Sequence, residues 1–165
     1  MADIDLGYPS EDDWPWITEK YVETAWDSLS AGRQRRVSKQ VVQDCIVDQI
    51  TRFRDKHGTA NQVVIARDNG ARVGFIWVDQ SRSGFTGVVQ AYILSVYVTE
   101  TCRGKGLGRL LMSRAEDWAR EHNFASMGLG VAAHNVSAIT LYEKLGYATE
   151  TLRMVKDLDG STAAA

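Results

Sequence analysis

Apolar residues recur at helical spacing in the first third of the chain. Residues 10–13 (SEDD) are typical of a helix start, because acidic side chains are favoured in a first turn. The pattern predicts a helix over residues 16–29, with Pro15 tolerated near its beginning. It predicts a second helix that ends at residues 56–58, where basic residues precede a glycine. The apolar face expected for this second helix consists of Val37, Val41, Cys45, Ile46, Ile50 and Phe53.

The pattern then changes to that of strands. Residues 63–66 form a short apolar run, and the Asp-Asn-Gly sequence at residues 68–70 is a hairpin turn signal. A returning strand is expected over residues 73–78, and a Gly/Ser-rich turn over residues 81–87 leads to a third strand over residues 88–98. Two or three antiparallel strands are therefore expected before the next helix.

Helices and strands alternate in the last third of the chain. An amphipathic helix is predicted over residues 107–123, a strand over residues 127–131, and a helix over residues 137–145 with Asn135 as its cap. A last strand is expected over residues 147–156. This order of elements predicts an α/β domain with a mixed sheet.

Length and composition fit one globular domain. The chain has 165 residues, of which 44% are hydrophobic and 24% are charged, close to the average of globular proteins. No repeat or linker divides the sequence, so residues 1–158 are expected to form a single domain. The small residues at 159–165 are expected to form a frayed tail.

Charge and hydropathy limit the partners. The formal net charge is -2, which gives no global field that attracts nucleic acid. No apolar run approaches the ~20 residues of a membrane span, and no secretory signal is evident, so we expect no membrane partner and a cytoplasmic location. The two cysteines and three histidines are scattered, and their spacing indicates no metal site.

The sharpest motif is the hexapeptide RGKGLG at residues 103–108, between a predicted strand and a predicted helix. A helix start presents unpaired backbone N–H groups and the positive end of the helix dipole. Glycines let this backbone approach an anion closely. Arg103, Lys105 and Arg109 add positive charge, so the loop suits a pyrophosphate.

Two common phosphate-binding motifs do not fit this loop. A Walker loop needs Ser or Thr after Gly-Lys, but Gly106 follows Lys105. A dinucleotide fingerprint needs G-x-G-x-x-G, which begins at neither Gly104 nor Gly106. What remains is R-x-x-G-x-G, formed by Arg103, Gly106 and Gly108. For these six residues alone, a plain glycine-rich turn before a helix is the alternative.

The surrounding segments make the motif more specific. Residues 93–98 (ILSVYV), followed by residues 103–108, strongly resemble motif A of the GNAT superfamily of N-acetyltransferases. A second group resembles motif B at the right separation and consists of Asn135, Ala138, Leu141, Tyr142, Lys144, Leu145, Gly146 and Tyr147. The resemblance spans about residues 63–156. It implies a mixed, mostly antiparallel central sheet flanked by helices and splayed between the family's fourth and fifth strands. It also implies direct transfer of an acetyl group from acetyl-CoA to a primary amine, without a metal.

The same resemblance implies roles for individual residues. The third predicted strand would carry a bulge, and the backbone of Val96 and Val98 would bind the pantetheine arm. Tyr142 would lie near the thioester sulfur, as the candidate acid that protonates the departing thiolate. The amide of Val96 or Tyr97 would bind the oxyanion. The implied cofactor-binding set is Val96, Tyr97, Val98, Arg103, Gly104, Lys105, Gly106, Leu107, Gly108, Arg109, Asn135, Tyr142 and Lys144.

The sequence leaves the general base open. Relatives that use a glutamate carry it on the third strand, but residues 88–99 contain no carboxylate. Proton removal is therefore expected through water, or by a carboxylate elsewhere such as Glu23, Asp27 or Asp79. Cys102 has no evident histidine partner, which favours direct transfer without an acetyl-enzyme.

The function also has alternatives at this stage. The missing strand carboxylate gives weight to a non-catalytic acyl-CoA-binding sensor or interaction module, in which Tyr142 is a core aromatic. A nucleotide-binding protein is a third possibility, against which the two failed motifs argue. The acceptor amine, on a small molecule or a protein, is not specified. Many relatives form homodimers, to which the last strand can contribute.

Overall fold

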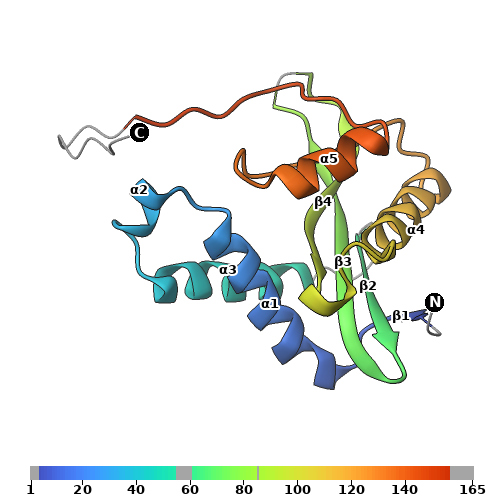
Figure 1. Ribbon diagram of the computed structural model, residues 1–165. Helices are drawn as coiled ribbons and strands as arrows, with labels where there is room; N and C mark the ends of the chain where they lie inside the picture. Colours follow the sequence, from blue (N-terminus) through green and yellow to red (C-terminus); the bar gives the residue numbers. More distant parts are fainter. Residues whose placement is uncertain (1–3, 55–60, 85, 157–165) are drawn as a thin grey trace.

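Figure 1 shows the computed structural model, which describes residues 4–54, 61–84 and 86–156. Its strands are β1 (Ile4–Gly7), β2 (Asn61–Asp68), β3 (Ala71–Arg82), β4 (Val89–Val98) and β5 (Met127–Leu129). Its α-helices are α1 (Trp14–Asp27), α2 (Ala31–Gln34), α3 (Lys39–Arg54), α4 (Leu107–Glu121) and α5 (Val136–Lys144). Two 3₁₀ turns, η1 (Glu11–Asp13) and η2 (Glu100–Cys102), precede α1 and follow β4.

The strands form one sheet in the order β1-β2-β3-β4-β5. Neighbours from β1 to β4 pair antiparallel, and β5 joins β4 in parallel. The β2–β3 hairpin closes on Asn69 and Gly70, both with positive φ, as the Asp-Asn-Gly signal predicts. The expected mixed, mostly antiparallel sheet flanked by helices is thereby confirmed.

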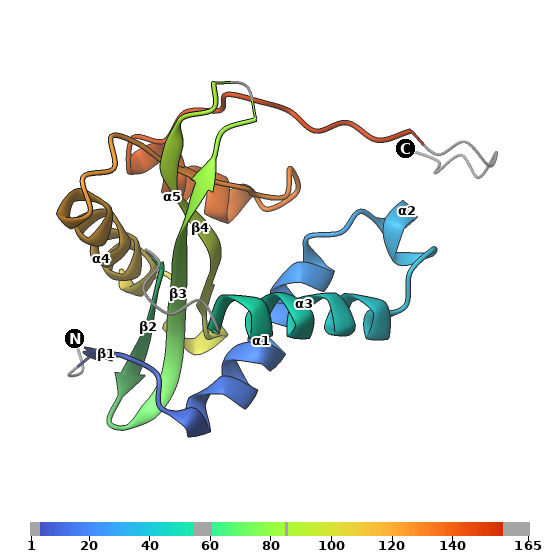
Figure 2. The same cartoon turned by 180° about the vertical axis from the view of Figure 1, so that it is seen from behind.

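Helices cover both faces of this sheet (Figures 1 and 2). On one face, α1 and α3 pack against Phe75 and Trp77 of β3. On the other face, α4 packs against Ile76 and Val78 of the same strand. Since successive side chains of a strand point to opposite faces, β3 is buried on both sides, and this explains its unbroken apolar run.

The segment before α1 ties this helix to the β2–β3 hairpin. Asp13 is only 2% exposed, and its carboxylate accepts hydrogen bonds from Arg67 at 2.6 Å and Arg72 at 2.7 Å. The backbone N–H and the hydroxyl of Ser10 donate to the same carboxylate. A buried charge with this many partners is fully compensated, so it fixes the position of α1 over the sheet.

Most predicted elements are found, with shifted ends. The predicted second helix is found as α3, and its predicted end at residues 56–58 lies outside the described residues. The short helix α2 before it was not predicted. The prediction that Val41 and Cys45 belong to a buried face is wrong, because both are exposed on α3. The sequence pattern did not indicate β1, whose four residues offer only two alternating apolar positions.

The strand predicted over residues 147–156 is wrong. These residues pair with none of the described strands, and Leu152 and Met154 are 82% and 91% exposed. A strand forms only where a neighbour satisfies its N–H and C=O groups, so alternating composition alone does not create one. The tail predicted over residues 159–165 lies outside the described residues.

Candidate functional site

A gap opens between β4 and β5. The two strands pair only from Ala91–Met127 to Ile93–Leu129, and then they separate. The separation coincides with a bulge in β4, where Trp77 of β3 pairs with Ser95 and Val78 pairs with Ile93, so Leu94 is left without a partner in the register. The expected bulge and splay are both present, and beyond them β4 has no paired strand on this side among the described residues.

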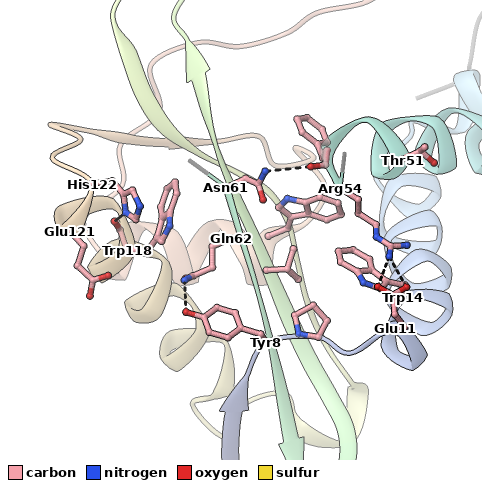
Figure 3. A pocket seen from close by; sticks show the side chains of 14 residues that line it. Tyr8, Glu11, Trp14, Thr51, Arg54, Asn61, Gln62, Trp118, Glu121 and His122 are labelled. Atoms are coloured by element: carbon pink, nitrogen blue, oxygen red, sulfur yellow. Dashed lines mark hydrogen bonds and ion pairs between the residues drawn. The ribbon is translucent and has the colours of Figure 1, made fainter. Parts of the chain in front are cut away.

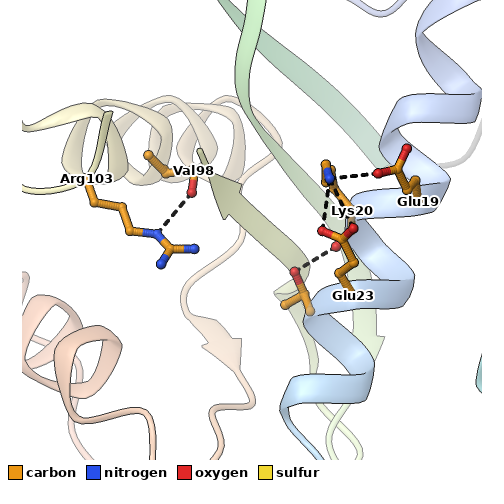
Figure 4. Close-up of polar contacts among 6 residues, drawn as sticks. Glu19, Lys20, Glu23, Val98 and Arg103 are labelled. Atoms are coloured by element: carbon orange, nitrogen blue, oxygen red, sulfur yellow. Dashed lines mark hydrogen bonds and ion pairs between the residues drawn. The ribbon is translucent and has the colours of Figure 1, made fainter. Parts of the chain in front are cut away.

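The backbone N–H and C=O groups of successive β4 residues point alternately toward β3 and into this gap. Thr99 donates its N–H to Val73 of β3. Because N–H groups alternate between the two sides of a strand, those of Val98 and Val96 face away from β3, and that of Tyr97 faces it. The carbonyl of Val98 confirms this direction, since it accepts a bond of 3.2 Å from Nε of Arg103 (Figure 4). The edge therefore offers the N–H groups of Val96 and Val98 to a ligand.

The glycine loop lies directly after this edge. Gly104 and Gly106 take left-handed φ values of 72° and 87°, and α4 begins at the next residue. The first helical bond of α4 runs from the N–H of Leu110 to the carbonyl of Gly106, so the preceding N–H groups over residues 107–109 have no partner within the helix. Arg103, Lys105 and Arg109 are exposed around them. This is a backbone site for an anion, with positive charge nearby.

Two residues of the loop also pack the fold. Leu107 is buried in the core cluster on the α4 face of the sheet. A Cβ on Gly108 would lie 3.2 Å from Leu141 of α5. The small residue at position 108 therefore allows α5 to approach the start of α4, which brings the second motif against the first.

Helix α5 carries the remaining predicted residues. The side chain of Asn135 caps α5 by accepting the N–H of Ala138 at 3.2 Å, as predicted. Tyr142 is 9% exposed and shares a core cluster with Val96 and Leu107. Burial raises the pKa of Tyr142, and its hydroxyl has no hydrogen-bond partner among the described residues. Lys144 is exposed at the other end of α5 from Asn135, about 13 Å away along the helix axis.

The opposite wall of the site is formed by α1. Lys20 donates to Glu19 at 2.7 Å and to Glu23 at 3.0 Å (Figure 4). Hydrogen bonds to these two carboxylates raise the pKa of Lys20, and its ammonium lies 6.0 Å from the ring of Tyr97. His134, next to Asn135, is bonded through Nε2 to the main-chain carbonyl of Asp27 at 2.8 Å. The end of α1 is thus joined to the loop that leads into α5.

The three carboxylates considered as bases differ in their surroundings. Glu23 is held in the ion pair with Lys20, and Asp27 is exposed at the end of α1. Asp79 is 3% exposed, and its Oδ1 accepts the N–H of Gln80 at 2.7 Å. Sequence reasoning did not single out Ser95, whose buried hydroxyl at the bulge has no partner among the described residues. The register of the sheet places it there, and no local signal in the sequence marks it.

A cavity of about 890 Å³ lies elsewhere (Figure 3). It borders Trp118 and His122 near the end of α4, about 20 Å along this helix from the glycine loop. Its wall contains the bidentate Arg54–Glu11 contact and the Trp14 ring beneath Arg54. These contacts join the end of α3 to the start of α1, so we assign this cavity a structural role.

Neither a metal centre nor a membrane span is found in the part of the chain that the structure describes. Among its histidine, cysteine, aspartate and glutamate side chains, no group of three is placed to bind an ion. None of its helices combines the length and the apolar character of a bilayer-crossing segment.

Comparisons with known proteins agree with this geometry. The sequence pattern that defines the "Acetyltransferase (GNAT) family" matches residues 18–147. The uncharacterized N-acetyltransferase YdgE of Bacillus subtilis is 37% identical over 94 residues, which are 57% of this chain and 59% of that protein. The L-amino acid N-acyltransferase MnaT of Escherichia coli is 35% identical over 85 residues, or 52% of this chain and 49% of that protein. The chain thus spans about half the length of the curated relatives it matches.

Solved structures share the fold over nearly the whole chain. A protein of Pyrococcus furiosus superposes with a TM-score of 0.76 at 21% identity, covering 94% of this chain and 100% of that one. The protein AAC(6′)-Iy, solved in complex with the bisubstrate analog CoA-S-monomethyl-acetylneamine, superposes with a TM-score of 0.65 at 12% identity, covering 94% and 99%. At these identities the likeness shows the fold alone.

Proposed function

Because this chain belongs to the acetyltransferase (GNAT) family, we propose that it transfers the acetyl group of acetyl-CoA directly to a primary amine. The observation that carries this proposal is the continuity of the β4 edge with the glycine loop. One side offers the N–H groups of Val96 and Val98, and the next turn offers those over residues 107–109. A long ligand with an amide-rich arm and a diphosphate fits such a surface.

The proposed cofactor contacts follow the order of the chain. The pantetheine arm would add to the β4 edge at Val96 and Val98, as an extra strand does. The diphosphate would accept the loop amides over residues 104–109, with Arg103 alongside. Asn135 and Lys144 would contact the cofactor from α5. The CoA-based analog bound to AAC(6′)-Iy supports a coenzyme A ligand for a chain of this fold.

The proposed chemistry is one displacement. The neutral amine attacks the thioester carbon, and the carbonyl oxygen becomes an oxyanion that the Val96 N–H stabilises. The C–S bond then breaks, and the thiolate takes a proton from the Tyr142 hydroxyl, whose raised pKa keeps it protonated near neutral pH. The proton lost by the amine goes to water or to a carboxylate. We favour Val96 over Tyr97 as donor, because the Tyr97 N–H faces β3.

The acceptor class rests on weaker support. The name of the Escherichia coli relative describes an amino-acid acceptor for that protein, which supports testing α-amino acids first. Lys20, Glu19 and Glu23 on the α1 wall together carry one net negative charge. Solvent screens this single charge, so it gives only a small preference for a cationic over an anionic acceptor. We therefore limit the proposal to a primary amine on a small molecule or a protein.

A second candidate function is a non-catalytic acyl-CoA-binding module. The absence of a carboxylate on β4 favours it, together with the ion pair that engages Glu23. The presence of Tyr142 and the glycine loop favours the enzyme.

We further propose that residues 1–158 act as one domain in the cytoplasm, where the free thiols of Cys45 and Cys102 remain reduced.

Binding and turnover separate these candidates. A CoA ligand at ~100 times its Kd should stabilise the fold by about 2.7 kcal/mol, measured as a thermal shift. Thiol release from acetyl-CoA is then followed with α-amino acids, polyamines and lysine peptides. Release that depends on the amine supports the enzyme, and a thermal shift without release supports the binding module. If neither appears with CoA, both candidates are wrong.

A further inference from the structure

The bulge of β4 holds a buried hydroxyl that no contact within the fold explains. Ser95 is 5% exposed, and its Oγ has no hydrogen-bond partner among the described residues. Buried polar groups in folded proteins nearly always have a partner, so an orphaned one calls for a physical reason such as strain, a bound water or a role in catalysis. Bulges re-aim side chains and are frequent next to active sites. The surroundings of Ser95 therefore decide what its hydroxyl binds.

Ser95 lies on the α1 side of the sheet. It pairs with Trp77 of β3, and directly paired residues of two strands share one face. Trp77 packs with the helices α1 and α3, whereas Val96, the next residue of β4, packs with the α4-side core that contains Tyr142. The proposed acid Tyr142 and the Ser95 hydroxyl thus lie on opposite faces of the sheet, with the Val96 N–H at the sheet edge between them.

Two hydroxyls of α1 are, by contrast, already bonded. Tyr21 donates to Oε1 of Gln49 at 2.8 Å. Thr24 donates to the carbonyl oxygen of Lys20, also at 2.8 Å. Both hydroxyls are engaged within the helical layer, so neither needs a ligand. The hydroxyl of Ser95 differs from them, because its capacity to donate and to accept is unused among the described residues.

Trp77, the cross-strand partner of Ser95, belongs to a different region. Its Nε1 also has no hydrogen-bond partner among the described residues. Its ring lies 5.6 Å from that of Trp14 and 5.8 Å from that of Phe53, and it borders the cavity drawn in Figure 3. This packing places the indole between the start of α1 and the end of α3, away from the gap between β4 and β5. Ser95 is therefore the orphaned group at the gap.

Covalent geometry keeps the Ser95 hydroxyl beside the Val96 N–H. Oγ of a serine and the nitrogen of the next residue are four bonds apart, which limits their separation to about 5 Å in every rotamer. The Val96 N–H faces the gap, and an oxygen that accepts it lies about 2.9 Å from the nitrogen. Rotation about χ1 turns the hydroxyl toward such an oxygen without moving the backbone. The N–H then reaches the oxygen in the plane of the sheet, and the O–H reaches it from the α1 face.

We propose that Ser95 is a second oxyanion donor, so that its hydroxyl and the Val96 N–H both donate to the carbonyl oxygen of the thioester. This inference rests on the proposed acetyl transfer and adds a catalytic residue to it. Negative charge develops on that oxygen as the amine attacks, so both hydrogen bonds are stronger in the transition state than in the ground state. The C–N bond forms and the C–S bond breaks as proposed above, and Ser95 keeps its proton throughout.

The test measures the carbonyl stretch of acetyl-CoA bound to the full-length chain, by isotope-edited infrared spectroscopy with a heavy-carbon label at the acetyl carbonyl. Each hydrogen bond to a carbonyl oxygen lowers the stretching frequency, and the measurement needs no amine. The unaltered chain is compared with Ser95→Ala. Ser126→Ala is the matched control, because Ser126 is exposed beside the paired part of β4 and β5, and its hydroxyl donates to Gln90.

We expect a lower frequency in the unaltered chain and in Ser126→Ala than in Ser95→Ala. With an amine that supports thiol release, Ser95→Ala should lower kcat by about 10²-fold, the usual effect of losing one oxyanion donor. Its Kd for CoA should not change, because CoA has no thioester carbonyl. Its melting temperature should match that of the unaltered chain, since the hydroxyl that is removed has no partner in the described fold.

Equal frequencies in the unaltered chain and in Ser95→Ala overturn this inference, while amine-dependent thiol release by the unaltered chain leaves the proposed function standing. A lower melting temperature of Ser95→Ala with an unchanged frequency means that the hydroxyl stabilises the fold through a buried water, and it overturns the inference too. If the unaltered chain does not bind acetyl-CoA, the inference and the proposed function fail together.

Discussion

Nε of Arg103 donates a hydrogen bond of 3.2 Å to the carbonyl oxygen of Val98, which joins the glycine loop to the last residue of β4. This bond fixes the position of the glycine loop relative to the β4 edge, which are the two ends of the proposed cofactor site. One end is a strand edge that can pair with an extended ligand, and the other is a helix start that can bind an anion. A ligand that satisfies both ends must be long and must carry its charge at the correct distance from its amides.

Gly106→Ala should weaken CoA binding. Residue 106 has a φ of 87°, where a side chain costs roughly 1–2 kcal/mol, so the loop should change its conformation or lose order. We expect about a 10-fold increase in the Kd for CoA, measured by calorimetry. Gly84→Ala is the control, since nothing lies within 4 Å of its added Cβ and its φ is not left-handed. Equal affinities for Gly106→Ala and the unaltered chain would argue against an anion site at this loop.

Tyr142→Phe should lower turnover and leave CoA affinity unchanged. If the hydroxyl protonates the departing thiolate, its removal should reduce kcat by about 10²-fold or more. Tyr147→Phe is the matched control, because the two rings are 6.0 Å apart and the Tyr147 hydroxyl contacts Glu116 and Met127 instead. Steady-state rates with saturating acetyl-CoA give the comparison. Undiminished turnover in Tyr142→Phe would leave Tyr142 as a core aromatic only.

Local features of the site could be predicted from the sequence. The glycine-rich turn before α4 and the cap at Asn135 depend on a few neighbouring residues, so short motifs specify them. The bulge at Leu94 could not be derived in this way, because it is a relation between β4 and β3, and the resemblance alone supplied it. The absence of a strand over residues 147–156 is also non-local, since an extended segment becomes a strand only where a partner edge is available.

Asp13→Asn should destabilise the fold without affecting the site chemistry. Burial raises the pKa of Asp13, but hydrogen bonds from Arg72 and Ser10 and the charge of Arg67 outweigh it, and the pKa falls to about 2. A carboxylate with a lowered pKa adds stability above its unfolded pKa, and this contribution is lost as the pH falls through the folded value. From a starting value of 3.8, the contribution is about 2 kcal/mol and disappears between about pH 4 and pH 2.

Urea unfolding near neutral pH and near pH 2 measures this contribution. The difference between the unaltered chain and Asp13→Asn should be at least about 2 kcal/mol at neutral pH and should shrink in acid. Asp12→Asn is the control, because Asp12 is exposed and only its main-chain carbonyl accepts a bond from Arg72. A difference that does not change with pH would mean that packing, not charge, accounts for the effect of Asp13.

His134→Ala should raise the KM for the amine and leave the Kd for CoA unchanged. The bond from His134 to the carbonyl of Asp27 joins the α1 wall to the loop before α5, so its loss should loosen the acceptor side of the gap. One hydrogen bond is worth about 1 kcal/mol, which corresponds to roughly a 5-fold change in KM. Asp27→Ala keeps this main-chain carbonyl and removes only the carboxylate, so it separates the effect of the hydrogen bond from that of a candidate base. An unchanged KM in His134→Ala would mean that the bond to His134 has no part in acceptor binding. A lower kcat in Asp27→Ala would indicate instead that the Asp27 carboxylate takes the proton from the amine.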